Sequence, residues 1–451
     1  MAAAKKVFVK TFGCQMNVYD SQRIGEALAG EGYAPTAAIE EADMVILNTC
    51  HIREKAAEKV YSDLGRIRQV KDRRLQQGKD TIVAVAGCVA QAEGREIVRR
   101  APLVDIVVGP QSYHRLGDLV ARTRSQRGPV VETGFPVVSK FAALPPRADA
   151  SRPAAYLTVQ EGCDKFCTFC VVPYTRGAEA SRPVADLEVE ARQLVGNGTT
   201  ELTLLGQNVN AYRGLGPDGQ HWTLAQLIRH LARIDGLERL RYTTSHPGDM
   251  SKELISAHGE VAKLMPQLHL PFQAGSDRIL AAMQRKHTAQ DYLALIDRLR
   301  AVRPDLALST DIIVGFPGET DADFAATLTL TEQVGFAQAY CFKYSPRPGT
   351  PASALRGQVP ETEKTQRLHQ LQALVGRQQT SFNSAFVGTV MSVLFERAGQ
   401  RSGQIIGRSP YLQAVHAQGR ADWVGRSLDV EILAAGPNSL SGLIRDPARA
   451  A

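Results

Sequence analysis

Short apolar runs without clean polar alternation recur along the first 125 residues. Four of them read as strands covered on both faces: KVFVKTFG (6–13), DMVILNT (43–49), TIVAVAG (81–87) and VDIVVG (104–109). Helix-like stretches lie between them, such as residues 20–32, where Asp20 or Ser21 is placed to begin a helix and Gly30 or Gly32 to end it. Strands that alternate with helices predict a parallel α/β domain over residues 1–125.

The same alternation resumes after residues 126–153, a stretch rich in Pro and Arg that we interpret as a linker with room for one strand. From 154 to 379, six apolar runs predict strands: AYLTVQ, ELTLLGQ, RLRYTTS, QLHLPFQ, LALSTDIIVG and QAYCFKY. Helical stretches such as QDYLALIDRLRAV separate several of them. Six parallel strands predict a partial (β/α)6 barrel with its site at the carboxyl ends of the strands.

The pattern changes again over residues 380–445. Short strand-like runs alternate with Gly, Ser and Asn turns, and no strong helix is indicated, so a small all-β barrel is expected. From residue 381 onward the chain has seven Arg and no Lys, against five acidic residues. Arginine suits phosphate contacts because the guanidinium is a planar group with several donors.

Composition adds little to this division. The chain of 451 residues fits about three domains, and 44 % apolar residues suffice for well-formed cores. A net charge of +7 permits an acidic partner such as nucleic acid without establishing one. No apolar run reaches the length of a membrane span, and no secretory segment is indicated, so a cytoplasmic protein without a membrane partner is expected. Thiols stay reduced there, and clustered cysteines then bind metal or do chemistry.

Three of the seven cysteines follow the first barrel strand as C-x3-C-x2-C: Cys163, Cys167 and Cys170. A zinc site needs a fourth ligand, yet no histidine lies between His114 and His221, although a remote fourth ligand stays possible. Three thiolates suffice to hold three irons of a [4Fe–4S] cluster, and they leave the fourth iron open to chelate a small molecule. We therefore favour an iron–sulfur site.

Three more cysteines each come directly after a predicted strand of the first domain: Cys14, Cys50 and Cys88. The carboxyl ends of parallel strands share one edge of a sheet, where ligands bind. A single free cysteine is commonly a small buried apolar residue, but three in the same relation to a strand end favour a second three-cysteine cluster. Cys341 lies inside a strand pattern without a partner and is assigned to the core.

C-x3-C-x2-C after the first strand of a partial β/α barrel resembles the radical S-adenosylmethionine enzymes. The resemblance implies that S-adenosylmethionine binds the open iron, and that its reductive cleavage gives a 5′-deoxyadenosyl radical that removes hydrogen from an unactivated C–H bond. It also implies cofactor contacts at Gly177 and Glu179, shortly after the cysteines. Further contacts carried over by position at the strand ends are Gln207, Ser245, Gln273 and Asp311.

The order of the three domains resembles the methylthiotransferases over nearly the whole chain, and residues 380–445 resemble the RNA-binding TRAM domain. TFGCQMNVYDS, NTCHIREKA and YSPRPGTPA resemble the branch that acts on tRNA, while QAGS (273–276) differs slightly from the expected QSGS. The resemblance implies two [4Fe–4S] clusters and methylthiolation at C2 of N6-dimethylallyladenosine beside the anticodon. A second S-adenosylmethionine would supply the methyl group.

Other targets stay open. Sister enzymes of the same family modify threonylcarbamoyl-adenosine in tRNA or an aspartate of a ribosomal protein. A non-catalytic, zinc-stabilised RNA-binding protein is the alternative from another class, although six strand-end cysteines without histidines disfavour it.

The expected partners are the anticodon stem-loop of tRNA and an electron donor such as a flavodoxin or ferredoxin, and the chain is expected to be a monomer. Candidates for stacking on bases are Phe395, Tyr411 and Trp423, although each suits a core position better. Residues 52–75 carry eight Lys or Arg against four acidic residues and suit either phosphate contacts or a solvated helix face.

Overall fold

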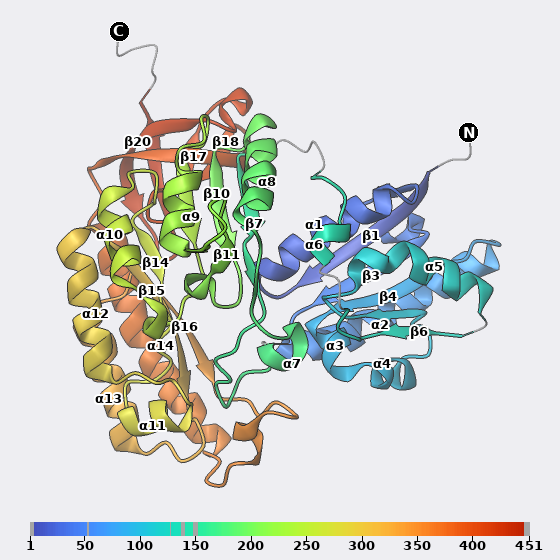
Figure 1. The fold of residues 1–451 in the computed structure, drawn as a ribbon, viewed down its shortest axis with the longest axis horizontal. Coiled ribbons are helices and arrows are strands. Elements are labelled where there is room, and N and C mark those ends of the chain that lie inside the picture. The colour runs from blue at the N-terminus through green and yellow to red at the C-terminus, as the bar shows by residue number, and fades with distance from the viewer. Residues whose placement is uncertain (1–3, 52–53, 127, 137–139, 148–151, 446–451) are drawn as a thin grey trace. The chain divides into compact units, whose positions relative to one another are not determined.

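The computed structural model describes residues 4–51, 54–126, 128–136, 140–147 and 152–445, and the side chains of residues 54–57 lie outside that description (Figure 1). The chain divides into two compact units. The first takes residues 1–148 together with 161–164 and 170–179. The second takes residues 149–160, 165–169 and 180–451.

A six-stranded sheet forms the centre of the first unit, in the order β2-β1-β3-β4-β5-β6 with every pairing parallel. Its strands are β1 (Lys5–Phe12), β2 (Tyr33–Pro35), β3 (Met44–Thr49), β4 (Ile82–Gly87), β5 (Ile106–Val108) and β6 (Val130–Glu132). The four strands expected from the sequence are β1, β3, β4 and β5, and the parallel α/β fold is confirmed. The short strands β2 and β6 extend the two edges.

Helices cover both faces of this sheet, which explains why its strands lack polar alternation. One face packs on α1 (Gln15–Ala29), η2 (Tyr113–Arg115) and α5 (Leu116–Ser125) through a core that contains Ile24, Ile46 and Leu119. The other packs on α2 (Glu54–Gln76), α3 (Cys88–Glu93) and α4 (Arg95–Arg100) through Leu47, Leu64 and Ile97. Two short elements complete the unit, η1 (Ile39–Glu41) and α6 (Lys140–Ala143).

Helix α1 begins earlier than the capping pattern predicts. Its N-cap is Cys14, so Asp20 and Ser21 lie inside the helix, and Asp20 is buried. The expected end is correct, because the helix stops at Ala29 with Gly30 as its C-cap. Tertiary partners therefore explain Asp20 better than a capping role does.

Six parallel strands of the second unit build the partial barrel, in two three-stranded sheets ordered β13-β10-β7 and β14-β15-β16. A parallel bridge from Leu240 to Leu264 links β13 to the segment before β14. The strands are β7 (Ala154–Thr158), β10 (Glu201–Leu205), β13 (Arg239–Tyr242), β14 (Gln267–His269), β15 (Ala307–Val314) and β16 (Gln338–Lys343). All six correspond to the expected runs.

Helices of varied length follow the barrel strands and the loops between them. They are α8 (Val184–Gly196), α9 (Leu224–Leu231), α10 (Lys252–Glu260), α11 (Asp277–Ala282), α12 (Ala289–Val302), α13 (Asp321–Val334) and α14 (Glu361–Ser384). Smaller elements decorate the loops: β8 (Gln160–Glu161), α7 (Val172–Arg176), β9 (Ala180–Ser181), η3 (Val209–Ala211), β11 (Arg213–Leu215), β12 (His221–Thr223), η4 (Pro247–Asp249) and η5 (Pro351–Ala354).

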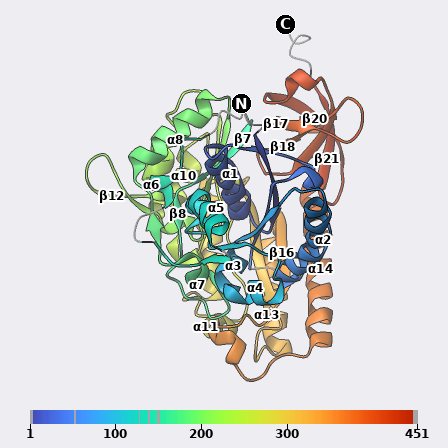
Figure 2. The ribbon, with the colours of Figure 1, turned by 90° about the vertical axis from the view of Figure 1, so that its right-hand side faces the viewer.

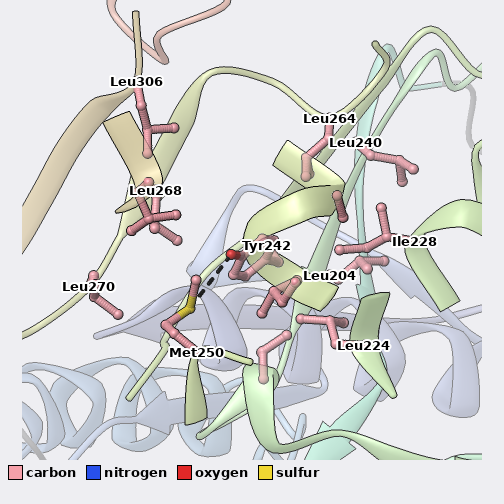
Figure 3. Close-up of a cluster of buried hydrophobic side chains, with 14 of the residues drawn as sticks. Leu204, Leu224, Ile228, Leu240, Tyr242, Met250, Leu264, Leu268, Leu270 and Leu306 are labelled. Atoms are coloured by element: carbon pink, nitrogen blue, oxygen red, sulfur yellow. Dashed lines mark hydrogen bonds between the residues drawn. The ribbon is translucent and has the colours of Figure 1, made fainter. Parts of the chain in front are cut away.

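Leucine side chains from adjacent barrel strands pack against the covering helices (Figure 3). Leu204 and Leu240 lie beside Leu224 and Ile228 of α9, and all four are buried. Each such side chain stabilises the fold by roughly 1.5–3 kcal/mol relative to its exposure in water. Cys341 packs at the edge of this core, as expected from the sequence.

The last strands of the chain form a closed five-stranded barrel in the order β17-β18-β19-β21-β20 (Figure 2). They are β17 (Val390–Ala398), β18 (Gln404–Arg408), β19 (Ala414–Gln418), β20 (Ser427–Ala435) and β21 (Ser439–Ile444), with η6 (Ala421–Trp423) before β20. The small all-β barrel is confirmed. Two buried arginines of β13 form hydrogen bonds with backbone carbonyl oxygens of this barrel. Arg239 donates to those of Ser392 and Arg408. Arg241 donates to those of Ser409 and Pro410.

In the part of the chain that the structure describes, no helix combines the length and the apolar character that a membrane crossing requires.

Candidate active site

Three cysteines meet at the carboxyl edge of the sheet in the first unit. Strands β1, β3 and β4 end level with one another, because their last residues are paired directly. The Cys14 and Cys50 side chains share a hydrogen bond, and the charges of Cys14 and Cys88 act on each other. The structure thus brings together the three residues that the strand-end pattern selects.

These thiols are neighbours, but their side chains are not arranged around one position for a metal ion. Among the described residues, no group of three or more His, Cys, Asp or Glu side chains has the arrangement that a metal ion requires. Coordination of iron by the cysteines therefore stays a prediction.

Glycine is required directly before two of these cysteines. Gly13 has φ +121°, and a Cβ atom there would lie 2.1 Å from Cβ of Cys50. Gly87 has φ +89°, and a Cβ atom there would lie 2.4 Å from Oδ1 of Asn48. Only a residue without a side chain allows the strand ends to approach so closely in this backbone conformation.

A chain of amides supports Cys14. The Cys14 thiol donates to Oδ1 of Asn17 at 3.2 Å, and Nδ2 of Asn17 donates to Oδ1 of Asn48 at 3.1 Å. Asn48 in turn donates to the Asn17 carbonyl oxygen and to Oγ of Ser21, both at 2.9 Å. Asn17 and Asn48 are fully buried, so this network fixes the position of Cys14 in a dry environment.

The electrostatic environment shifts the pKa values of two of the thiols in opposite directions. A hydrogen bond from Cys50, helped by the charge of Arg176, lowers the pKa of Cys14 to about 6 in spite of burial. Burial raises the pKa of Cys88, although Arg176 opposes that shift. Cys14 is therefore better prepared than Cys88 to act as a thiolate at neutral pH.

Arg176 belongs to a buried group of four charged side chains, a quartet that also contains Asp20, Lys140 and Glu161. Arg176 donates to Asp20 at 2.6 Å and to Glu161 at 2.9 Å, while Lys140 lies 2.7 Å from Glu161 and 3.5 Å from Asp20. Gln111 donates to both Glu161 and the Arg176 carbonyl oxygen. None of the four charged side chains is more than 4 % exposed.

This quartet is not predicted by the sequence pattern. Its members are far apart along the chain, and Asp20 resembles an ordinary helix cap. The one available signal is the position of Arg176, a lone charge at the end of the apolar run VVPYTR and directly before Gly177.

The second cysteine motif lies on the loop between β8 and α7. The amide of Cys163 donates to the carbonyl oxygen of Gly177 at 3.2 Å. Asp164 and Glu179 exchange two hydrogen bonds between backbone amides and carboxylates, at 3.2 and 3.4 Å. Gly177 and Glu179 therefore shape the segment around Cys163.

Two sulfurs of this motif accept N–H groups. Arg285 Nη1 donates to Sγ of Cys167 at 3.7 Å, and the amide of Val172 donates to Sγ of Cys170 at 3.5 Å. Lys165, inside the motif, forms an ion pair with Asp249 at 2.8 Å. Donors aimed at sulfur suit thiolates, which carry negative charge when they bind iron.

Two expected cofactor contacts lie at neighbouring strand ends of the barrel. The amide of Gln207 donates to Oε1 of Gln160 at 3.0 Å. Ser245 is buried, and its hydroxyl has no hydrogen-bond partner among the described residues. The residue before it, Thr244, has φ +68°, an uncommon value for a β-branched residue. A strained backbone and an unused hydroxyl together are typical of a ligand site.

The other two expected contacts lie on the second half of the barrel. Gln273 has φ +72° and forms a parallel bridge with Ile312. Asp311 lies inside β15 and not in the loop that follows it. Its Oδ2 is 3.5 Å from Nε2 of His269, which also packs edge-on against Tyr340. These side chains follow one face of the sheet, where Tyr340 is 43 % exposed.

The three aromatic residues proposed to stack on RNA bases have different positions. Phe395 is fully buried in the β-barrel core and is unsuitable. Tyr411 packs against Phe386, and its hydroxyl donates to Asp305 at 3.2 Å. Trp423 is partly exposed and packs at the edge of the barrel core, so it stays a candidate for stacking on bases.

Basic side chains of the closed barrel are partly unpaired. Arg397, Arg401 and Arg426 are exposed, and none forms an ion pair with a described acidic side chain within 4.0 Å. In the described part of the basic stretch 52–75, two basic side chains form ion pairs with residues outside the stretch: Arg74 with Asp43, and Lys71 with Asp105. Residues 52 and 53 lie outside the described residues.

Three family matches cover separate parts of the chain. Residues 6–109 match the uncharacterised protein family UPF0004. Residues 157–331 match the radical SAM superfamily, and residues 384–444 match the TRAM domain.

Solved structures share the fold at low sequence identity. OxsB, a cobalamin-dependent S-adenosylmethionine radical enzyme solved with aqua-cobalamin and S-adenosylmethionine, aligns with a TM-score of 0.54 and 12 % identity. The alignment covers 83 % of this chain but only 56 % of OxsB. TsrM, a radical S-adenosylmethionine methyltransferase from Kitasatospora setae solved with cobalamin and a [4Fe-4S] cluster, gives a TM-score of 0.57, 14 % identity and coverages of 78 % and 77 %. At these identities the likeness shows the fold alone.

Proposed function

We propose that this chain, whose order of UPF0004, radical SAM and TRAM domains fits the radical SAM methylthiotransferase family, acts on tRNA. The proposed activity is that of a tRNA-2-methylthio-N6-dimethylallyladenosine synthase. One observation carries the proposal: Cys14, Cys50 and Cys88 converge at one sheet edge, in a domain that precedes a second three-cysteine motif.

The residues of both sites fit iron–sulfur clusters. In the first site, a hydrogen bond from Cys50 and the charge of Arg176 lower the pKa of Cys14 and prepare it to bind as a thiolate. In the second, N–H groups of Arg285 and Val172 already point at cysteine sulfurs. Soft thiolate donors favour iron–sulfur clusters over a lone hard cation.

A [4Fe–4S] cluster on Cys163, Cys167 and Cys170 would supply the electron that cleaves S-adenosylmethionine, and one on Cys14, Cys50 and Cys88 would present the sulfur. The chain's own residues would bind the cofactor and hold the cysteine loop in place. Gln207, Ser245 and Gln273 offer polar groups at strand ends for the cofactor, and the ion pair of Lys165 with Asp249 holds the cysteine loop.

The chemistry of the substrate supports a radical enzyme. The C2–H bond of adenine is aromatic and not acidic, so a side-chain base has no useful route to remove the hydrogen. A cofactor must therefore carry the difficult step, and the protein contributes placement and exclusion of water. A second S-adenosylmethionine, when bound, would supply the methyl group to a nucleophilic sulfur by ordinary transfer.

The C-terminal barrel supports RNA as the substrate. It matches the TRAM domain and carries the exposed residues Arg397, Arg401 and Arg426. Guanidinium groups suit phosphate oxygens, and an anticodon loop offers unstacked bases. The proposal includes a separate electron donor, such as a flavodoxin or ferredoxin.

The test is mass analysis of tRNA nucleosides from a strain that lacks the gene. We expect 2-methylthio-N6-dimethylallyladenosine to disappear and N6-dimethylallyladenosine to accumulate, with recovery by the wild-type gene but not by Cys14→Ala. A normal level of the methylthiolated nucleoside would contradict the assignment. Loss of methylthiolated threonylcarbamoyl-adenosine, or of a modified ribosomal-protein aspartate, would point to a sister activity.

A further inference from the structure

A buried arginine reaches a sulfur of the second cysteine motif. Nη1 of Arg285 donates to Sγ of Cys167 at 3.7 Å, and Nη2 donates to the carbonyl oxygen of Pro271 at 2.6 Å. Arg285 is 5 % exposed and Cys167 is 8 % exposed, so the contact lies in a largely dry environment, where such contacts are strong. Both residues belong to the second compact unit.

The end of helix α11 determines where Arg285 lies. The helix stops at Ala282, and the amide of Gln284 donates to the Ala281 carbonyl oxygen at 3.0 Å. The amide of Arg285 donates to the Leu280 carbonyl oxygen at 2.9 Å. These two hydrogen bonds form a Schellman motif, which needs a residue with positive φ directly after the C-cap and commonly uses glycine. The chain has Gln284 there, so the turn that presents Arg285 is strained.

Strained backbone lies next to both partners of the N–H···S contact. Gln284 and Lys286, on either side of Arg285, have φ +59° and φ +48°. Phe166, directly before Cys167, has φ +49°. Left-handed conformations are uncommon for residues other than glycine, and they persist where the surrounding structure holds them, often at functional sites.

Hydrogen bonds tie the cysteine loop to the segment before Arg285. Thr168 directly follows Cys167, and its amide donates to the Met283 carbonyl oxygen at 3.1 Å. The Thr168 hydroxyl donates to the Ala282 carbonyl oxygen at 2.9 Å. The contact between Cys167 and Arg285 is therefore built into the fold and is not a chance approach of a long side chain.

The charge of Arg285 is not balanced by a carboxylate. Among the described residues, no Asp or Glu oxygen lies within 4.0 Å of its guanidinium nitrogens, and its Nε has no hydrogen-bond partner. Arg241 and Arg367, which are buried in the same unit, each have a carboxylate oxygen within 2.9 Å. A buried charge is costly unless an opposite charge lies beside it. Cys167 carries negative charge when it binds iron, so a cluster there supplies the anion that Arg285 needs.

We propose that Arg285 is a positioning residue that supplies the counter-charge of the iron–sulfur site at the second cysteine motif, and that its N–H contact with Cys167 raises the reduction potential of that site. The inference deepens the proposed function and rests on it, because it requires a cluster at this motif. A cation that donates to a ligand sulfur stabilises the more negative reduced form. Lysine carries the charge but not the planar fork, so it replaces only part of this contact.

The experiment isolates the second site in the full-length chain. Cys14, Cys50 and Cys88 are replaced by alanine, and the anaerobically reconstituted protein, without S-adenosylmethionine, serves as the parent. Arg285→Gln and Arg285→Lys are compared in this background. Arg300→Gln is the matched control, because Arg300 lies in the same unit and donates to a backbone carbonyl oxygen at 2.5 Å, but forms no hydrogen bond with a described sulfur.

The measurements are iron per chain, the electron paramagnetic resonance spectrum of the reduced protein and the midpoint potential. We expect Arg285→Gln to lower the potential and change the spectrum, Arg285→Lys to lie between it and the parent, and Arg300→Gln to stay close to the parent. Equal shifts in Arg285→Gln and Arg300→Gln would overturn the inference, as would an unchanged potential in Arg285→Gln with full iron content.

Two outcomes keep the inference separate from the proposed function. A parent that binds no iron contradicts the proposed function, and the inference falls with it, whereas an iron-loaded parent whose potential Arg285→Gln shares refutes the inference alone. If Arg285→Gln does not fold, by circular dichroism, or does not bind iron, then Arg285→Lys decides: a lowered potential supports the inference, and a potential equal to that of the parent refutes it.

Discussion

Replacing Gly87 by alanine tests whether close packing before Cys88 is essential to the first site. Gly87 has φ +89°, and an added Cβ would lie 2.4 Å from Oδ1 of Asn48 and 3.1 Å from Nδ2 of Asn17. With ψ −159°, this backbone conformation is nearly restricted to glycine and costs about 1–3 kcal/mol for alanine. Crowding of a packed interior adds about 1–3 kcal/mol. The crowded atoms belong to the amide network that holds Cys14, so the site is displaced as well.

Gly78 provides the control for the cost of placing alanine at a positive φ. It has φ +73°, and a Cβ there would meet nothing within 4 Å. Gly78→Ala therefore carries a positive-φ penalty and the same effect on the unfolded chain, without the crowding. The difference between Gly87→Ala and Gly78→Ala in free energy of unfolding is expected to be about 1–3 kcal/mol.

The assay is urea denaturation of the iron-free protein, followed by circular dichroism, together with iron content after anaerobic reconstitution. We expect Gly87→Ala to unfold at lower urea concentration than Gly78→Ala and to bind less iron at the first site. Equal unfolding free energies and equal iron content in the two variants would refute the claim that Gly87 is required for packing.

Three further results are expected. Cys163→Ala should abolish cleavage of S-adenosylmethionine, while Cys14→Ala should keep cleavage and lose methylthiolation; product formation by either variant would contradict separate roles. Replacing Arg397 and Arg401 by glutamine should reduce the salt dependence of RNA binding by roughly 0.7 in log–log slope for each phosphate that the variant no longer neutralises, whereas an unchanged slope would exclude both side chains from phosphate binding. Burial lowers the pKa of His258 to about 4, so the folded state resists protonation and stability should fall as pH drops from about 6.5 towards 4. Melting temperatures of His258→Gln should show a weaker slope, because the lowered pKa values of His246 and His287 keep part of it, and a slope equal to that of the wild type would rule out a contribution from His258.

Much of the fold follows from local pattern. The runs that became β1, β3 and β4 are apolar throughout, and both faces of their sheet are indeed covered by helices. Because parallel strands share an edge, the placing of Cys14, Cys50 and Cys88 follows from topology without any long-range information. The six barrel strands and the closed β-barrel are predicted on the same grounds.

What the sequence does not predict depends on tertiary partners. Asp20 resembles a helix cap, yet α1 starts at Gln15 and Asp20 binds the buried Arg176. Ion pairs between residues 156 positions apart leave no periodic signal. Asp311 is a further case: the run 306–315 predicts its strand, but no local pattern predicts that its carboxylate lies 3.5 Å from His269.

Iron content tests the two-site account most directly. Anaerobically purified and reconstituted wild-type protein should be brown and hold about eight irons per chain, four for each three-cysteine set. The triple variant of Cys14, Cys50 and Cys88 should hold about four and still cleave S-adenosylmethionine. Protein that stays colourless after reconstitution with iron and sulfide, or that holds stoichiometric zinc instead, would contradict the account.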